Sequence, residues 1–393
     1  MNTNRLYPHI GQELRFRRRA VLTLLTLCLC FIVIRQLAGS TVESSHAIEI
    51  VAEISGPEPS GIVVARDGRI FLGFPRHAID HKKATLAEYK DGKLIPFPNA
   101  AMSLPSDVQA ADRLVSVHGM TMDSEGRLWL IDDGKTAGRP IPPGGAKVVG
   151  FDIETGNVVG KALLAPSALL PDSHMNDLRV DLTHGAKGVA YISDSSFGTS
   201  SALVVVDLET GKARRVLASN PSTRAEPGFM AFFQGRPLVY DPRRPSFPVG
   251  GADGITLSAD SKRLYWTTLT GRRLYSIATD LLADARVSDE KLAAAVVDEG
   301  ERPACDGLAT DRSNRIYFGA FEQDSIVRRN PDGRFDLVAH DPRIVWPDGL
   351  FTADTYLYVT LGQANRQPGF NDGLDLRRPP YLVVRVRIDD AVR

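Results

Sequence analysis

The sequence predicts an all-β protein, a six-bladed β-propeller with four-stranded blades. Two observations lead to this fold class. After residue 47, short runs of apolar residues are separated by Gly, Asp, Asn and Pro, with almost no helical periodicity; such a pattern is typical of strands joined by turns. In addition, one unit recurs six times in a single register. A repeat of about 40–50 residues holding four strands is typical of a propeller blade.

The first element is an export segment, which we place at residues 1–46. The basic stretch Arg15–Arg19 is followed by the apolar run Ala20–Ile34, and this order is typical of an export signal. The basic side should stay cytoplasmic. The run is shorter than the ~20 residues of a spanning helix, but it can extend through residues 20–38, so a cleaved signal peptide and a retained membrane anchor both remain open. We expect the rest of the chain to be periplasmic or secreted.

The next element is a strand at residues 47–54, which precedes the first repeat and has no unit of its own. The sixth repeat lacks room for a fourth strand after Tyr381–Ile388. We therefore predict that the N-terminal strand completes the last blade and closes the ring, since closure removes free sheet edges. The alternative fold, a pair of β-sandwiches, does not explain six copies in one phase.

The blades of the domain at residues 47–393 each begin with a polar residue, then a small residue in most copies, then an apolar one. Alternation with period two puts that apolar residue on the same face in every copy. The predicted starts are near residues 60, 118, 176, 253, 306 and 348. The longest step contains a segment at residues 218–251 that is rich in Pro, Gly and aromatic residues, and we predict that it forms a packed lid. One helix-like stretch, Ala278–Val297, predicts a short loop helix.

Composition excludes several classes of protein. The 47 basic and 47 acidic residues balance, whereas a nucleic-acid binder needs a basic face. Cys305 is the only cysteine outside the export segment, so the body has no internal disulfide and no pair of cysteine metal ligands. We expect a monomer that meets the membrane only through its N-terminal segment and has a small molecule as its partner.

The blade starts form the candidate site, because the first strand of each blade lines the central channel. Three adjacent blades contribute carboxylates, and close like charges favour a bound cation, a protonated carboxyl or a basic ligand. Oxygen ligands suit Ca²⁺, and a histidine nitrogen suits a proton or a softer metal. The opposing interpretation, in which each Asp-Gly is a turn whose Asp accepts from the backbone, stays open. The six predicted ligand-binding residues are Ser60, His118, Asn176, Asp253, Asp306 and Asp348.

The second strand of each blade returns to the same mouth of the channel. Asp132 and Asp194 lie at the ends of two of these strands. We predict that they also bind the ligand from the rim of the pocket, although charged residues at such positions are commonly solvated loop residues.

Several segments of the chain resemble the yellow/major royal jelly protein family. This resemblance implies a secreted six-bladed propeller that binds small amines or other small ligands in its channel. Some insect members are dopachrome-converting factors, and bacterial relatives are described as related to dopachrome tautomerase. The matching segments are Val117–Gly134, Asn176–Ser196, Gly251–Ile277, Ala304–Asn330 and Val345–Thr360.

The blade starts are also similar to those of the gluconolactonase/senescence-marker group. In those lactonases a glutamate of the first blade, together with Asn and Asp at later starts, holds a divalent cation. Asn176 and Asp253 match two of these positions, which implies Ca²⁺ or Zn²⁺ as a cofactor. The first start departs from the pattern: it is Ser60, and Glu58 stands two residues earlier on a different phase.

Three functions therefore remain open. The first is an exported propeller that binds a small polar or cationic molecule, with dopachrome-tautomerase-like isomerase chemistry in which His118 is the acid–base and Asp253 and Asp306 polarise it. The second is a lactonase with a metal at Asn176 and Asp253. The third is a non-catalytic binding scaffold in the envelope. The fold alone decides among none of them.

Overall fold

The computed structural model describes residues 46–196, 198–233, 235–238 and 250–388 of the chain. These residues belong to one compact unit, Ser45–Arg393. The predicted export segment, apart from residue 46, lies outside the described residues. Within the described part of the chain, no helix has both the length and the apolar character needed to cross a bilayer.

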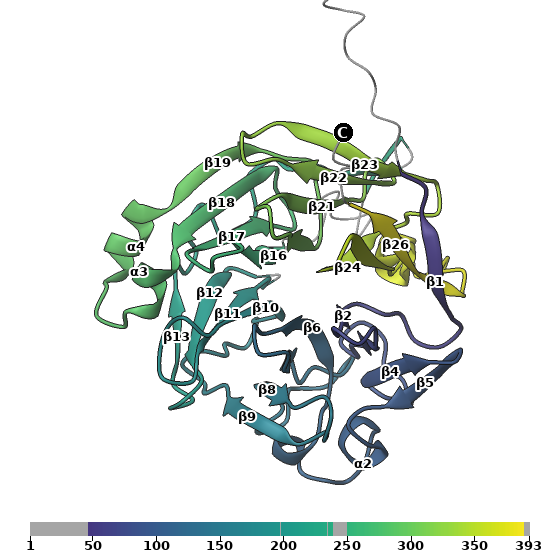
Figure 1. The fold of residues 1–393 in the computed structure, drawn as a ribbon, viewed down its shortest axis with the longest axis horizontal. Coiled ribbons are helices and arrows are strands. Elements are labelled where there is room, and N and C mark those ends of the chain that lie inside the picture. The colour runs from purple at the N-terminus through teal and green to yellow at the C-terminus, as the bar shows by residue number, and fades with distance from the viewer. Residues whose placement is uncertain (1–45, 197, 234, 239–249, 389–393) are drawn as a thin grey trace, which may run out of the picture. The chain divides into compact units, whose positions relative to one another are not determined.

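Six four-stranded antiparallel sheets are arranged in order around a common centre (Figure 1), as predicted. Each innermost strand neighbours the innermost strands of the preceding and following blades, and β24 neighbours β2. The strands are β2 (Ile62–Val64), β3 (Ile70–Gly73), β4 (Leu86–Lys90) and β5 (Lys93–Pro96); β6 (Val117–Met122), β7 (Leu128–Asp132), β8 (Lys147–Phe151) and β9 (Val158–Leu163); β10 (Met175–Asp181), β11 (Val189–Asp194), β12 (Ala202–Asp207) and β13 (Ala213–Val216); β16 (Ala252–Leu257), β17 (Arg263–Thr268), β18 (Arg273–Ala278) and β19 (Val297–Glu301); β20 (Leu308–Thr310), β21 (Ile316–Ala320), β22 (Ser325–Arg329) and β23 (Phe335–His340); and β24 (Pro347–Ala353), β25 (Tyr356–Leu361), β26 (Tyr381–Arg387) and β1 (Glu49–Ile54).

The N-terminal strand closes the ring, which confirms the prediction. Strand β1 pairs antiparallel with β26, from Glu49 opposite Arg385 to Ile54 opposite Tyr381. It is the outermost strand of a blade whose other three strands come from the C-terminal end of the chain. The first and last described segments therefore share one sheet, and the ring lacks an open seam.

The hydrophobic core lies between successive blades. Middle strands are buried on both faces, as in β11, where all six residues are buried; this burial explains their continuous apolar runs. Outer strands alternate instead, and Val158 on β9 remains 46% exposed. One cluster joins Ile131 of the second blade to Leu178 and Ile192 of the third. Contacts of this kind position each blade start relative to the next.

Each blade start is shaped by two local features. In four blades the pairing of the first two strands skips the polar residue and the residue after it, which is glycine in three of them, for example between Pro347 and Leu350. Such irregularities release a side chain from the ladder and re-aim it. The small residue is required by the next blade: a Cβ on Gly307 would collide with the carbonyl oxygen of Asp348, and a Cβ on Gly349 with that of Ser60.

The remaining elements are short. The predicted loop helix is two helices, α3 (Thr279–Ala283) and α4 (Asp289–Ala295). The described part of the 218–251 segment contains β14 (Phe232–Phe233) paired with β15 (Arg236–Pro237), and its Ala231 and Leu238 share a core cluster with Trp346. Its role as a lid stays a prediction. Other turns are α2 (Ala100–Ser103), η1 (Ala110–Asp112), η2 (Ala364–Arg366) and η3 (Pro368–Phe370).

Candidate functional site

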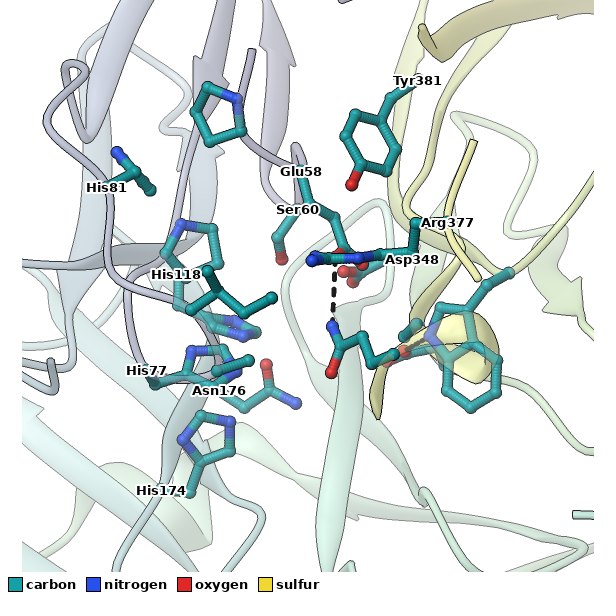
Figure 2. A pocket seen from close by; sticks show the side chains of 18 of the residues that line it. Glu58, Ser60, His77, His81, His118, His174, Asn176, Asp348, Arg377 and Tyr381 are labelled. Atoms are coloured by element: carbon teal, nitrogen blue, oxygen red, sulfur yellow. Dashed lines mark hydrogen bonds and ion pairs between the residues drawn. The ribbon is translucent and has the colours of Figure 1, made fainter. Parts of the chain in front are cut away.

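A cavity of about 830 Å³ lies where the six blade starts converge (Figure 2). All six predicted start residues line it, although they come from six different blades. Its wall also includes residues that were not predicted from the sequence. They come from loops next to the inner strands, from the segment between β25 and β26, and from the start of β26. The cavity is lined by Ser60, His118, Asn176, Asp253, Asp306 and Asp348, and also by Glu58, His77, His81, His174, Trp346, Gln367, Phe370, Arg377 and Tyr381, among others.

One wall is a cluster of three imidazoles. His77 follows β3, His118 lies on β6, and His174 immediately precedes β10. Their ring centroids are 4.6 to 5.1 Å apart, and Figure 2 shows the three rings gathered beside Asn176. One nitrogen atom from each ring lies within 4.8 Å of the other two. Burial lowers the pKa of His118 to about 4 and holds those of His77 and His174 well below their usual range, so all three are neutral near pH 7.

Asp133 lies next to this imidazole cluster. Its Oδ2 atom is 3.6 Å from Nδ1 of His77 and 3.7 Å from Nδ1 of His174. The Oδ1 atom accepts a hydrogen bond from the backbone N–H of Lys135 at 2.8 Å, whereas Oδ2 accepts none from any described residue. Burial raises the pKa of the Asp133 carboxyl to about 7.

Asn176 and Asp253 are tied together at the floor of the cavity. The Asn176 side-chain N–H₂ donates to Oδ1 of Asp253 and, at 3.0 Å, to the hydroxyl of Ser195. That hydroxyl is also 2.8 Å from Oδ2 of Asp253. Both carboxylate oxygens of Asp253 thus have protein partners, and Asn176 turns its nitrogen toward them. This arrangement is less suited to a metal ion than the one the sequence predicted, because the groups meet each other and not a shared centre.

Three carboxyl groups continue the floor. Trp346 donates from its indole Nε1 to Asp306 at 2.7 Å. Burial raises the pKa of Asp253 to about 7; burial and the neighbouring carboxylates hold those of Asp306 and Asp348 well above their usual range. Asp253 accepts from Asn176 and Ser195, and Asp306 accepts from Trp346, in each case from a side chain. Carboxyl groups buried this close together resist ionising at the same time, so the floor favours bound protons or a positively charged ligand.

The opposite wall contains an ion pair that the sequence did not predict. Arg377 donates to Glu58 at 2.9 Å, and Gln367 donates to the same carboxylate at 3.0 Å. Figure 2 shows this pair beside Ser60, Asp348 and Tyr381. Burial raises the pKa of Glu58 to about 7, although the bonds from Arg377 and Gln367 oppose the rise.

Asp132 and Asp194 are not among the residues that line this cavity. Both are fully buried. Asp132 pairs with Lys147 at 2.7 Å and accepts from the backbone N–H groups of Val115 and Ser116. Asp194 pairs with Arg215 at 2.6 Å and also accepts from the backbone. Each therefore anchors the chain entering its blade, so nothing in this geometry supports the predicted ligand-binding role of the two residues.

The fold and the site together define a class: a six-bladed propeller with a cavity at one mouth of its channel, lined by side chains from every blade. A family model described as "Major royal jelly protein" matches residues 115–392, and the chain belongs to that family. A comparison with curated protein sequences finds no match.

Solved structures of other propellers are similar to this chain in fold. A calcium-binding protein, regucalcin, from Agrobacterium tumefaciens is 14% identical, with 88% of this chain and 96% of that chain covered and a TM-score of 0.52. A luciferin-regenerating enzyme is 12% identical, with 87% and 95% covered and a TM-score of 0.51. A gluconolactonase from Xanthomonas campestris is 12% identical, with 88% and 99% covered and a TM-score of 0.44. At these identities the likeness concerns the fold alone.

Proposed function

We propose that this exported propeller binds a small aromatic amine in the cavity at its channel mouth. The carrying observation is the cluster of buried carboxyl groups at Asp253, Asp306 and Asp348. A protonated amine supplies the positive charge that this floor lacks. The volume of about 830 Å³ suits a small ligand.

The aromatic part of the ligand has a matching wall. Trp346 is held rigidly, since its ring stacks on Phe321 with centroids 4.5 Å apart and its N–H is bonded to Asp306. Phe370 lies 6.5 Å from the Trp346 ring, and both residues line the cavity. Aromatic faces attract other rings and amine cations. An amine bound at the carboxyl floor would therefore keep its ring against this wall.

The two catalytic hypotheses have weaker support. The isomerase reading needs His118 as a single acid–base group, yet His118 is one of three adjoining imidazoles. The lactonase reading needs a metal at Asn176 and Asp253, but these two side chains are hydrogen-bonded to each other. We therefore propose non-covalent binding of the ligand and not its chemical conversion.

A matched pair of probes tests this proposal: tyramine, and 4-ethylphenol as its analogue without the amine. Titration calorimetry on the full-length chain in mild detergent should give at least 10-fold tighter binding of tyramine. Asp306→Asn keeps an oxygen for the Trp346 bond but removes the charge, and it should remove most of this preference. Asp332→Asn, at an exposed turn position, is the control. Equal binding of the two probes, or an unchanged preference in Asp306→Asn, would contradict the proposal.

A further inference from the structure

The geometry points to a second site on the same cavity wall. We propose that His77, His118 and His174 bind one zinc-type divalent transition-metal ion, with at least one coordination position open to the cavity. This inference stands apart from amine binding, because it uses the imidazole cluster and none of the carboxyl groups of the floor. It also differs from the metal site predicted at Asn176 and Asp253.

The ligand set is complete and converges from three blades. One nitrogen atom of each imidazole lies within 4.8 Å of the other two. Zinc–nitrogen bonds of 2.0–2.1 Å in tetrahedral geometry would bring such nitrogens to about 3.4 Å from one another. The nitrogens therefore need to approach one another by up to about 1.4 Å, and we expect side-chain rotations to supply this movement. His77 can contribute such a rotation, because it lies outside the sheets and is only partly buried.

Asp133 supplies the supporting carboxylate that imidazole metal sites commonly have. Metal-ligating histidines usually donate their second ring nitrogen to a carboxylate, which fixes the ring orientation. Nδ1 of His77 and Nδ1 of His174 lie 3.6 and 3.7 Å from the same Oδ2 atom of Asp133. Oδ2 has no hydrogen-bond partner among the described residues. Closure of the rings would bring both N–H groups into reach of this oxygen and turn the Nε2 atoms toward the metal.

The position of Asp133 shows which side of this site faces the protein interior and which side faces the cavity. The three histidines line the cavity, whereas Asp133 does not and is 1% exposed. The carboxylate therefore lies on the protein side, and the remaining metal positions face the cavity. Three protein ligands with an open position are typical of catalytic zinc sites, whereas structural sites are closed. The open position would take water or an oxygen atom of a small molecule.

The donor atoms decide the class of metal. Imidazole nitrogens suit zinc, copper, iron and nickel, whereas Ca²⁺ and Mg²⁺ prefer oxygen ligands. Nitrogen is the only donor type that the three ligands offer. The site should therefore discriminate against Ca²⁺ even though the cavity floor is rich in carboxyl groups.

The test uses the full-length chain without an affinity tag, freed of metal by a chelator and kept in mild detergent. Titration with Zn²⁺ against a chromogenic chelator should show one tight site per chain, at least 100-fold tighter than for Ca²⁺. Replacement with Co²⁺ should give the visible absorption bands of a four-coordinate ion. Zinc should raise the melting temperature of the wild type. Absence of a one-to-one zinc site, or a six-coordinate cobalt spectrum, would overturn the inference.

Variants then assign the ligands. His118→Ala and His174→Ala should each weaken zinc binding at least 100-fold, and Asp133→Asn by about 10- to 100-fold, as for other supporting carboxylates. His46→Ala is the matched control, because that side chain is exposed, and it should bind zinc like the wild type. Circular dichroism confirms that each variant is folded, and His118→Gln provides a conservative second variant. Unchanged affinity in folded His118 and His174 variants would refute the site, while tyramine binding in zinc-free protein tests the amine site separately.

Discussion

Replacement of Asp253 by asparagine should change how the stability of the protein depends on pH. Asp253 is 3% exposed, and burial raises the pKa of its carboxyl to about 7, whereas an unfolded aspartate titrates near 3.9. The folded state therefore keeps its proton over a pH range in which the unfolded state has lost it. Stability from this group is fully present below about pH 4 and is lost as pH rises to 7. Above pH 7 the loss levels off.

The size of the effect follows from the two pKa values. A difference of about three pKa units corresponds to about 4 kcal/mol of unfolding free energy between pH 4 and pH 7. Asp253→Asn removes the titration but keeps the size of the side chain. In the variant, the N–H₂ group of the new asparagine can face the Asn176 N–H₂ group, which now donates to Asp253. Reversal of the Asn176 amide would place its oxygen there, so that it accepts from the new N–H₂ group. The variant should therefore be close to the wild type near pH 5 and more stable than it by a few kcal/mol at pH 8.

Urea unfolding of wild type and variant at pH 5, 6, 7 and 8 measures this difference. The informative quantity is how the difference in unfolding free energy between wild type and variant changes with pH. The unfolding free energy itself is less informative, since Asp306 and other buried carboxyls titrate in both proteins. Asp332→Asn, on an exposed turn, is the control, and its unfolding free energy should fall with rising pH as that of the wild type does. Parallel curves for wild type and Asp253→Asn would refute the reasoning, because they would mean that Asp253 is ionised as easily in the folded protein as in the unfolded one.

Three further predictions concern the framework that holds the site. Gly307→Ala should lower the unfolding free energy by about 1–3 kcal/mol or more, because the new methyl group collides with the backbone of the next blade; differential scanning fluorimetry measures the loss. Lys147→Met should cost about 3–5 kcal/mol in urea unfolding, since Asp132 would stay buried without its cation. Ile54→Ala, a buried site on β1, should cost about 2–5 kcal/mol and increase proteolysis at the ring closure, whereas Ile50→Ala on the same strand, which is 43% exposed, should change neither.

The fold could be predicted because its signal is repeated. Every blade presents its apolar residues in the same phase, so the register of each copy supports the others. Closure by β1 could also be predicted, because the last repeat lacked a fourth strand and the predicted strand at residues 47–54 belonged to no repeat. The buried Lys147 had no comparable signal: it stands at the start of an apolar strand, and only the position of Asp132 across the sheet explains it.

Asp132 and Asp194, which were predicted at the rim of the site, lie at the ends of their strands but do not line the cavity. Asp132 turns toward Lys147, and Asp194 turns toward Arg215. The residues that follow them, Asp133 and Ser195, turn the other way and reach the imidazole cluster and Asp253. Successive side chains of a strand point to opposite faces, and the sequence alone does not reveal which of the two residues contacts the side chains that line the cavity.

The imidazole cluster was missed because its members share no spacing. His174 carried a weak signal, since it precedes the blade start Asn176 by two residues and period two places such a residue on the same side. Trp346 stands two residues before its blade start and lines the cavity as well. Glu58 also stands two residues before its blade start and lines the cavity, so the assignment of Glu58 to a different phase from Ser60 was wrong. His77 carried no signal, because a loop after β3 brings it to the site. A metal motif on one helix or one turn fixes its spacing in the sequence, but a site assembled from three blades does not.

The two residues of each Asp-Gly pair at the blade starts have different roles, and neither is the role expected if the pairs were only turns. The glycine is needed for packing, because the backbone of the next blade passes where its Cβ would be. The residue before the glycine is not restricted by this packing contact. Asp253 accepts from the side chains of Asn176 and Ser195. Asp306 accepts from the side chain of Trp346. An aspartate that only capped a turn would accept from backbone N–H groups. Packing therefore restricts the second position in the five blades that have glycine there, whereas the first position is Ser, His, Asn or Asp across the six blades. Chemistry at the channel mouth can thus change from blade to blade without altering the fold.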